Sequence, residues 1–241
     1  VLDAGEDRGQ AHARSELRGD EQPVHALLAE PGGEPFYPPM LAGDLAGGGA
    51  YLALGLLAAL LEASRSEVGQ VVDAAIVDGA VSMLTPFVGM VAAGIWKPGR
   101  GQNLLDGAAP FVGAYRTSDD RHVFVSPLEP KFFAVMLERM GIDDLDAARQ
   151  YDRKYWPVIR QRLEQVFAGR TRAEWAELLE GVDACCTPVL SLDELPDHAH
   201  LQERGSMVEV DGLRQPAPAP RFSPASSIAG SRLARAAEMF K

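Results

Sequence analysis

Two acidic residues lie where a carboxylate could do chemistry, and the first is Asp44. It stands in the run Gly-Asp-Leu-Ala-Gly-Gly-Gly at residues 43–49, at the expected start of an apolar helix. The positive end of a helix dipole stabilises and orients a carboxylate there, and the glycines would let a ligand approach backbone N–H donors. Such a carboxylate could act as a base or a nucleophile beside an enolate or oxyanion. The alternative is a capping Asp followed by glycines that permit tight helix packing, and the spacing alone leaves both open.

The second acidic residue, Glu129, directly precedes Pro130 and an amphipathic stretch. Because proline favours the first position of a helix, Glu129 is either a capping acid or a site carboxylate. The adjacent Cys185 and Cys186 have no neighbouring His or cation that would activate a thiolate, and they are predicted to be buried strand residues. Cysteines and histidines do not have zinc-ligand spacing either, so no metal is expected.

The net charge of the chain limits the classes of molecule that it is expected to bind. The 241 residues carry 34 acidic and 23 basic side chains, a net charge of −11, so neither nucleic acid nor an anionic membrane is an expected partner. Two cysteines make no disulfide scaffold, which favours a reducing, cytoplasmic location. The longest uncharged run, residues 45–61, reaches the lower limit for a membrane span, but it contains four glycines and lacks flanking aromatic anchors. We therefore expect a soluble protein in which this run is a core or subunit-interface helix.

Hydrophobic periodicity and helix breakers predict the elements that position these residues. Residues 1–24 are polar and acidic, and they are predicted to form a disordered or weakly helical tail. The first half is further expected to contain a helix over 44–66, a short strand over 70–76, an apolar helix over 79–94 bent at Pro86, and a Gly/Pro linker over 96–110.

After the linker the pattern becomes that of a small α+β unit. Its expected elements are strands at 111–117 and 122–126, helices at 130–140, 157–168 and 172–180, the last capped by Thr171, and a strand at 184–190. Beyond it the chain is expected to be partly helical over 193–204, to form a strand over 207–210, and to end in an extended, exposed tail rich in proline from Pro216.

Several of these segments together resemble the α-methylacyl-CoA racemase family, which belongs to the class III CoA-transferase fold. The matching motifs occur in the same order over residues 25–241. They are residues 43–49, 56–60, 69–75, 77–79, 101–110, 128–133, Trp175, 183–190 and 218–223.

The resemblance implies an α/β fold with a Rossmann-like large domain, a small α+β domain and two long linkers. Residues 25–105 would then be the end of the first part of the large domain plus the linker, and they would contain the catalytic Asp. Residues 106–195 would be the small domain, and 196–241 would return to the large domain. Most of the CoA-binding part of the family's large domain has no counterpart. The chain is therefore expected to be truncated at its N-terminus, with 1–24 as an unmatched lead-in.

The resemblance also implies a reaction. In the family, an Asp and a His on opposite sides of the α-carbon of a 2-methylacyl-CoA thioester exchange its proton through an enolate, which the thioester carbonyl stabilises. Asp44 matches the Asp, and Glu129 matches a Glu that orients the His within an interlocked homodimer. The Gly-His-Asp motif that carries this His is absent, so weak activity is expected from this chain alone. CoA is part of the substrate, and no separate cofactor is implied.

Two other functions stay open. In a class III CoA-transferase the same Asp44 would attack the thioester and form an acyl-enzyme anhydride. The third alternative is a non-catalytic, degenerate fragment that only dimerises, which the missing histidine motif favours. The segments 103–110 and 129–133 favour the racemase over the transferase.

Overall fold

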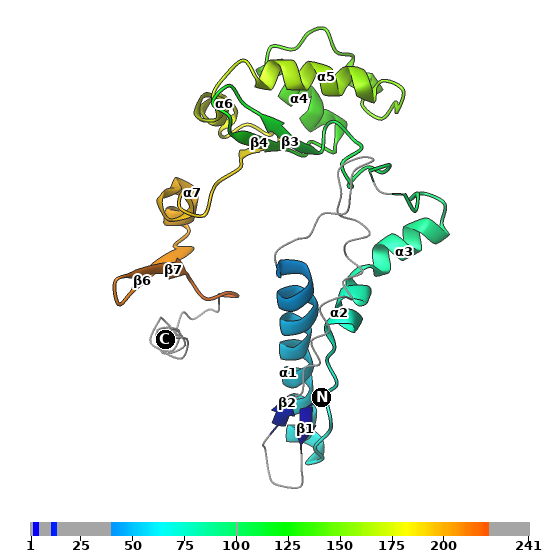
Figure 1. The fold of residues 1–241 in the computed structure, drawn as a ribbon, viewed down its shortest axis with the longest axis vertical. Helices are drawn as coiled ribbons and strands as arrows, with labels where there is room; N and C mark the ends of the chain where they lie inside the picture. The colour runs from blue at the N-terminus through cyan, green and yellow to red at the C-terminus, as the bar shows by residue number, and fades with distance from the viewer. Residues whose placement is uncertain (1, 5–10, 14–39, 100, 222–241) are drawn as a thin grey trace.

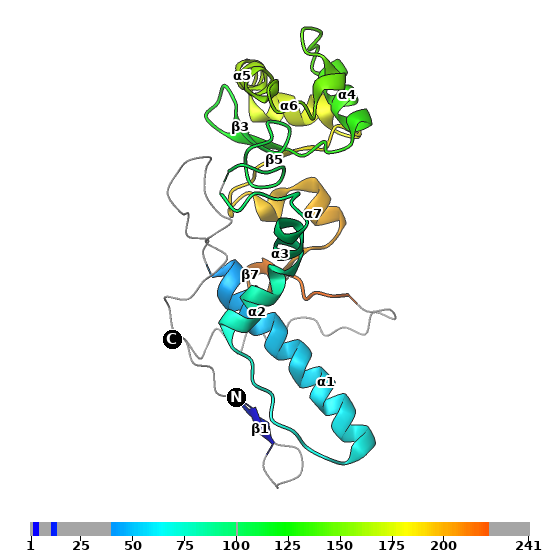
Figure 2. The ribbon, with the colours of Figure 1, turned by 90° about the vertical axis from the view of Figure 1, so that its right-hand side faces the viewer.

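The computed structural model describes residues 2–4, 11–13, 40–99 and 101–221 of the chain. Figure 1 shows two parts well separated, a helical arm around α1 (Tyr51–Ser66) and an α+β unit around α4 (Pro130–Arg139), with a further segment around α7 (Ala199–Glu203). The view in Figure 2 separates the same two parts. The candidate site residue Asp44 belongs to the arm, and Glu129 belongs to the unit.

The N-terminal segment contains two short strands where the sequence predicts none. β1 (Leu2–Ala4) and β2 (Ala11–Ala13) pair antiparallel, with Asp3 opposite His12. A two-stranded ladder needs only backbone N–H and C=O groups, which a polar composition still provides. The rest of the expected tail over 1–24 lies outside the described residues.

The arm begins with the expected apolar helix. η2 (Leu41–Ala50) is a π-helix that runs directly into α1, and α1 ends where Glu67 adopts a left-handed conformation with φ 59°. The prediction of a helix over 44–66 is confirmed, although it starts earlier and its first ten residues are π-helical. No residue of α1 is buried, so the helix is not part of a core in the described protomer. By length and composition alone, Leu41–Ser66 is a helix that could span a membrane.

The segment that follows α1, residues 70–92, differs from the prediction. Residues 70–76 form no strand, and only Val72 has a bridge-type pairing. No strand among the described residues pairs with this segment, and Ile76 already starts α2 (Ile76–Met83). The expected second helix is divided at Leu84 into α2 and α3 (Thr85–Ala92), because Pro86 takes a first-turn position of a new helix.

The linker after α3 is anchored by a buried amide. Asn103 is 1% exposed; its Nδ2 donates to the carbonyl of Lys97 at 2.9 Å and to Asp106 Oδ2 at 2.8 Å, and its Oδ1 accepts from Lys97 N at 2.8 Å. Arg160 Nη2 donates to the carbonyls of Gly107 and Ala108 at 2.8 and 3.0 Å. These bonds fix the entry of the chain into the α+β unit.

The sheet of the unit has three antiparallel strands in the order β3-β4-β5. β3 (Gly113–Arg116) and β4 (His122–Val125) form the predicted hairpin, with Arg116 opposite His122. β5 (Cys186–Pro188) adds to the other edge of β4, with Val125 opposite Cys186. The predicted strand over 184–190 is therefore confirmed in its central residues.

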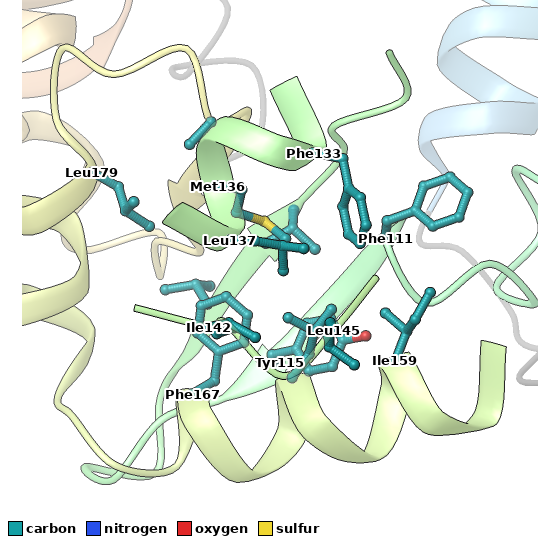
Figure 3. Close-up of a cluster of buried hydrophobic side chains, with 14 of the residues drawn as sticks. Phe111, Tyr115, Phe133, Met136, Leu137, Ile142, Leu145, Ile159, Phe167 and Leu179 are labelled. Atoms are coloured by element: carbon teal, nitrogen blue, oxygen red, sulfur yellow. The ribbon is translucent and has the colours of Figure 1, made fainter. Parts of the chain in front are cut away.

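Three helices cover this sheet, and all three were expected. They are α4, α5 (Trp156–Phe167) and α6 (Arg172–Leu179), with the short helix η3 (Ala147–Arg149) before α5. Thr171 caps α6 in a complete capping box with Glu174. Figure 3 shows side chains of α4 and α5 pointing into one cluster, whose buried members all lie between Ala109 and Ala184.

The chain leaves the unit through a clamped segment. Glu194 accepts from Arg121 Nη1 at 2.8 Å and from Arg172 Nη1 at 2.9 Å, and also from the backbone N–H of Ser191 at 2.8 Å. The expected partly helical stretch follows as η4 (Leu195–Asp197) and α7 (Ala199–Glu203).

The last described elements form a hairpin that the sequence predicts only in part. β6 (Met207–Val210) was expected, and β7 (Leu213–Pro216) pairs with it antiparallel, with Met207 opposite Pro216. The expected tail is extended and exposed at Pro216, as predicted, but Pro216 also pairs as the last residue of β7. Pro216 is tolerated because it is the final residue of the strand.

Candidate active site

Asp44 lies in the first turn of η2 and is half-buried. The expected helix-start position is therefore confirmed, but the capping position itself belongs to Met40. Leu45 N donates to Met40 O at 3.0 Å, the hydrogen bond of a π-helical turn. Acidic groups are stabilised in a first turn because the aligned peptide dipoles and unpaired N–H groups make that end positive. The π-helix widens this turn, and such insertions are frequent at functional sites.

The glycines after Asp44 mainly serve helix packing. A Cβ on Gly47 would lie 2.9 Å from Ala80 N and 3.1 Å from Ile76 O of α2, and a Cβ on Gly48 would lie 3.0 Å from a side-chain carbon of Ile76. Gly49 is different, because a Cβ there would meet only the carbonyl oxygen of Asp44, at 3.5 Å. Gly47 and Gly48 thus hold η2 against α2, whereas Gly49 is exposed and contacts no residue of α2.

Glu129 occupies the N-cap of α4 but does not cap it with its side chain. Its backbone carbonyl instead accepts from Phe132 N at 3.0 Å and Phe133 N at 3.1 Å. Thr171 shows the contrast, because its hydroxyl accepts from Glu174 N in the same kind of position. The carboxylate of Glu129 is exposed and is not used by the helix that it starts. A role as a capping acid therefore does not account for it.

The structure does not bring the two carboxylates together within one protomer. Figures 1 and 2 both show η2 and α4 in different parts of the molecule. A site that used both would need a second chain or a further part of the protein.

The cysteines make no nucleophile. Cys186 lies in β5, and Cys185 precedes it with φ 48°; both are half-buried, which corrects the expectation of full burial. Burial raises the pKa of Cys186 to about 12. Burial, with the charges of Glu129 and Asp183 as smaller causes, also raises the pKa of Cys185. A thiol needs a lowered pKa to react readily. Within the described part of the chain, no cluster of side chains could hold a metal ion.

Sequence reasoning missed two residues that support these positions. Gly79 of α2 faces Gly47, and nothing in the local sequence identifies this contact between helices. Gln150 is 1% exposed and donates to the two carbonyls before Glu129, at 2.8 and 3.2 Å. A polar side chain in a loop sequence gives no sign that it will be buried against a segment more than twenty residues away.

Comparison with known proteins identifies relatives of this chain. The chain is 40% identical to the mouse α-methylacyl-CoA racemase over 189 residues, which cover 78% of this chain and 49% of the mouse protein. It is 37% identical to the human α-methylacyl-CoA racemase over 198 residues, which cover 81% of this chain and 52% of the human protein. The chain thus spans about half the length of these curated relatives.

Solved structures share the fold at lower sequence identity. A crystal structure of Rv3272 from Mycobacterium tuberculosis superposes with a TM-score of 0.62 and 24% identity, over 84% of this chain and 55% of the other. A CAIB/BAIF family protein from Brucella suis gives a TM-score of 0.62 and 21% identity, over 85% and 55%. The family model of CoA-transferase family III matches residues 21–237. The chain is therefore a member of CoA-transferase family III.

Proposed function

We propose that the protein to which this chain belongs racemises 2-methylacyl-CoA thioesters by removing and returning the α-proton. The observation that carries the proposal is the 37–40% identity to two α-methylacyl-CoA racemases over about four-fifths of the chain. The position of Asp44 in the positive first turn of a helix supports it, because a carboxylate there is oriented and can take up a proton. In this proposal Asp44 is one of the two bases.

The chemistry depends on the thioester carbonyl of the substrate. When Asp44 removes the α-proton, the electron pair moves into the carbonyl and forms an enolate, whose oxygen carries the charge. Backbone N–H groups at a helix start are suited to stabilise such an oxygen. Gly49, five residues after Asp44, is exposed, and a substrate could approach the backbone there. No separate cofactor is proposed, because CoA enters as part of the substrate.

Racemisation needs a second acid that returns the proton to the opposite face. Glu129 is proposed to position that group, because its exposed carboxylate is available as a hydrogen-bond acceptor and is not used to cap α4. The Gly-His-Asp motif implied by the family resemblance is absent from the printed sequence. We therefore expect the 241-residue chain to exchange the α-proton slowly and to racemise poorly by itself.

We further propose a homodimer in which a second copy covers the apolar arm. Leu54, Leu57 and Leu61 are 64%, 67% and 53% exposed and lie on one face of α1, at helical spacing. Exposed apolar surface of this extent is typical of interaction sites. A dimer would also supply a second Glu129 to each arm. We also propose that the protein is cytoplasmic and takes part in fatty-acid metabolism.

Two alternatives are tested at the same time. As a CoA-transferase, the protein would use Asp44 as a nucleophile, which the match to the CoA-transferase family model over residues 21–237 favours. As a non-catalytic fragment, the chain would only associate with itself. The exposed apolar face of α1 favours this third function if neither chemistry is found.

The deciding experiment follows a single stereoisomer of a 2-methylacyl-CoA in D2O. Deuterium at the α-carbon is measured by mass spectrometry, and CoA transfer to an added free carboxylate is measured in the same tubes. We expect deuterium incorporation without CoA transfer. Asp44→Asn should reduce incorporation by about a hundredfold or more, the usual contribution of a general base. Asp73→Asn is the matched control, because Asp73 is an exposed acid outside the helix.

The outcomes separate the three functions. CoA transfer without deuterium incorporation would support the transferase and contradict the racemase. Incorporation that is equally fast in Asp44→Asn and unmodified chain would exclude Asp44 as the base. No reaction of either kind, together with intact folding, would leave the non-catalytic function.

A further inference from the structure

Gln150 is a buried polar residue at the end of η3, and its side chain reaches a distant segment. Its Nε2 donates to Pro127 O at 2.8 Å and to Leu128 O at 3.2 Å. These are the last two carbonyls before Glu129. The assignment of the amide is chemically determined, because both neighbours are acceptors and only the NH2 group can donate to them.

A second side chain holds the same segment. The hydroxyl of Tyr151 also donates to Leu128 O. The Tyr151 ring packs edge-on against Phe111, with centroids 5.4 Å apart, and Phe111 is fully buried. Two consecutive residues thus fasten one short stretch of backbone to the core.

The backbone of Gln150 is itself anchored. Its carbonyl accepts from Trp156 Nε1 at 2.8 Å, and its N–H donates to Ala147 O at 3.2 Å. Trp156 starts α5 and contacts the same aromatic cluster, with its ring 6.0 Å from that of Phe111. The core therefore holds the backbone of Gln150 in place, and the Gln150 side chain in turn holds the two carbonyls that precede Glu129.

The amide oxygen of Gln150 has no hydrogen-bond partner among the described residues, although it is buried. A buried acceptor without a partner is unfavourable, and an apolar side chain of the same length would avoid it. A contribution to folding stability therefore does not explain why this position is a glutamine. The two donated bonds give a better one, because an apolar side chain could not make them.

We propose that Gln150 is a positioning residue that fixes the backbone position from which the Glu129 carboxylate extends. Glu129 follows Leu128 directly, and its own conformation is extended, with φ −72° and ψ 134°. A rotation of the Leu128–Glu129 peptide would therefore swing the carboxylate. Gln150 and Tyr151 prevent that rotation by holding the Pro127 and Leu128 carbonyls. This inference rests on the proposed function, because Glu129 has a task only if it orients the second acid.

The test replaces Gln150 in two ways. Gln150→Met keeps the length and removes the donors, and Gln150→Glu puts an oxygen against the two carbonyl oxygens. The matched control is Gln202→Met, because Gln202 Nε2 also donates to a proline carbonyl, that of Pro196 at 3.2 Å, at an exposed position. Each variant is examined by amide hydrogen exchange and by α-deuterium incorporation into the 2-methylacyl-CoA.

We expect the amides of Phe132 and Phe133, which donate to Glu129 O, to exchange at least tenfold faster in Gln150→Met and faster still in Gln150→Glu. The kcat for deuterium incorporation should fall at least tenfold, with KM changed less than twofold. Gln202→Met should match the unmodified chain in both measurements. If Gln150 only filled space, the result would differ: Gln150→Met would keep the kcat of the unmodified chain, because methionine has a similar length.

The two readouts distinguish this inference from the proposed function. Unchanged amide exchange in Gln150→Met would overturn the positioning role, whatever the activity. Faster exchange at Phe132 and Phe133 in a protein without deuterium incorporation would show that Gln150 holds this backbone but would contradict the racemase. If Gln150→Glu fails to fold, Gln150→Met alone decides.

Discussion

The carbonyl oxygen of Gly47 occupies the space that a Cβ atom on Gly79 would need: the two atoms would lie 1.9 Å apart. η2 and α2 therefore touch through their backbones. Because Asp44 lies three residues before Gly47, this contact determines where the first turn of η2 stands relative to the rest of the arm.

Gly79→Ala should separate the two helices. No side chain can yield here, since the added carbon meets backbone atoms, and we expect a loss of about 1–3 kcal/mol in the free energy of unfolding. Gly89→Ala is the control: a Cβ at Gly89 in α3 meets nothing within 4 Å, so it should be neutral or stabilise by about 0.5–1 kcal/mol. Urea denaturation measures both. Equal stability of the two variants would show that the helices do not pack this closely.

Leu57→Glu should prevent self-association. The unmodified chain is expected to be dimeric in light scattering after gel filtration, because Leu57 is 67% exposed in the protomer. A charge at the centre of this face would have to be buried in the dimer, and the variant should elute as a monomer. Leu192→Glu, at an 86% exposed position in the exit segment, is the control and should stay dimeric. A monomeric unmodified chain that floats with phosphatidylcholine vesicles would instead indicate a membrane partner.

Glu194→Gln should loosen the exit from the α+β unit in a pH-dependent way. The hydrogen bond from Arg172 is the largest cause that holds the pKa of Glu194 well below its usual value of 4.5. A lowered pKa in the folded state gives stability that is present above the unfolded pKa and lost as the pH falls towards the folded one. The difference in Tm between Glu194→Gln and unmodified protein should thus be largest near neutral pH and shrink below about pH 4.

The control for Glu194 is Asp152→Asn. Asp152 pairs with Arg149 at 2.8 Å, three residues away in the same loop, so its loss disconnects no segments and should lower Tm less. A Tm difference for Glu194→Gln that is as large at pH 3 as at pH 7 would contradict the clamp.

The two thiols should react slowly and in a fixed order. With a pKa of about 12, the Cys186 thiolate fraction at pH 8 is about one in ten thousand, so alkylation by iodoacetamide should be far slower than for an ordinary cysteine. Cys185 should react first, since burial affects it less. Cys185→Ser should abolish the faster phase, and Cys186→Ser should keep it. Fast alkylation of both before denaturant is added would contradict the burial of Cys186.

Local sequence predicted the elements of the α+β unit well. Strand alternation located β3 and β4, and the Thr171 cap with Glu174 three residues later marked the start of α6. These signals act over a few residues. Local sequence also placed Asp44 and Glu129 at the starts of helices, where the structure has them.

The errors concern features that depend on distant partners. Residues 70–76 alternate like a strand but pair with no strand among the described residues, whereas β7 forms because β6 is there to pair with it. The close approach of Gly47 to Gly79 and the burial of Gln150 are likewise contacts between segments far apart in sequence. One sequence taken by itself carries no signal for such contacts.

The buried cluster of the α+β unit is drawn from one continuous stretch, Ala109 to Ala184, and this has a consequence for folding. Nothing from the arm is needed to complete that core, so a protease that cuts in the linker before it would leave a resistant fragment. Closure of the sheet nevertheless waits for β5, which pairs with β4 across some sixty intervening residues. During synthesis on the ribosome the hairpin and α4 would therefore be exposed, incompletely packed, until Cys186 emerges.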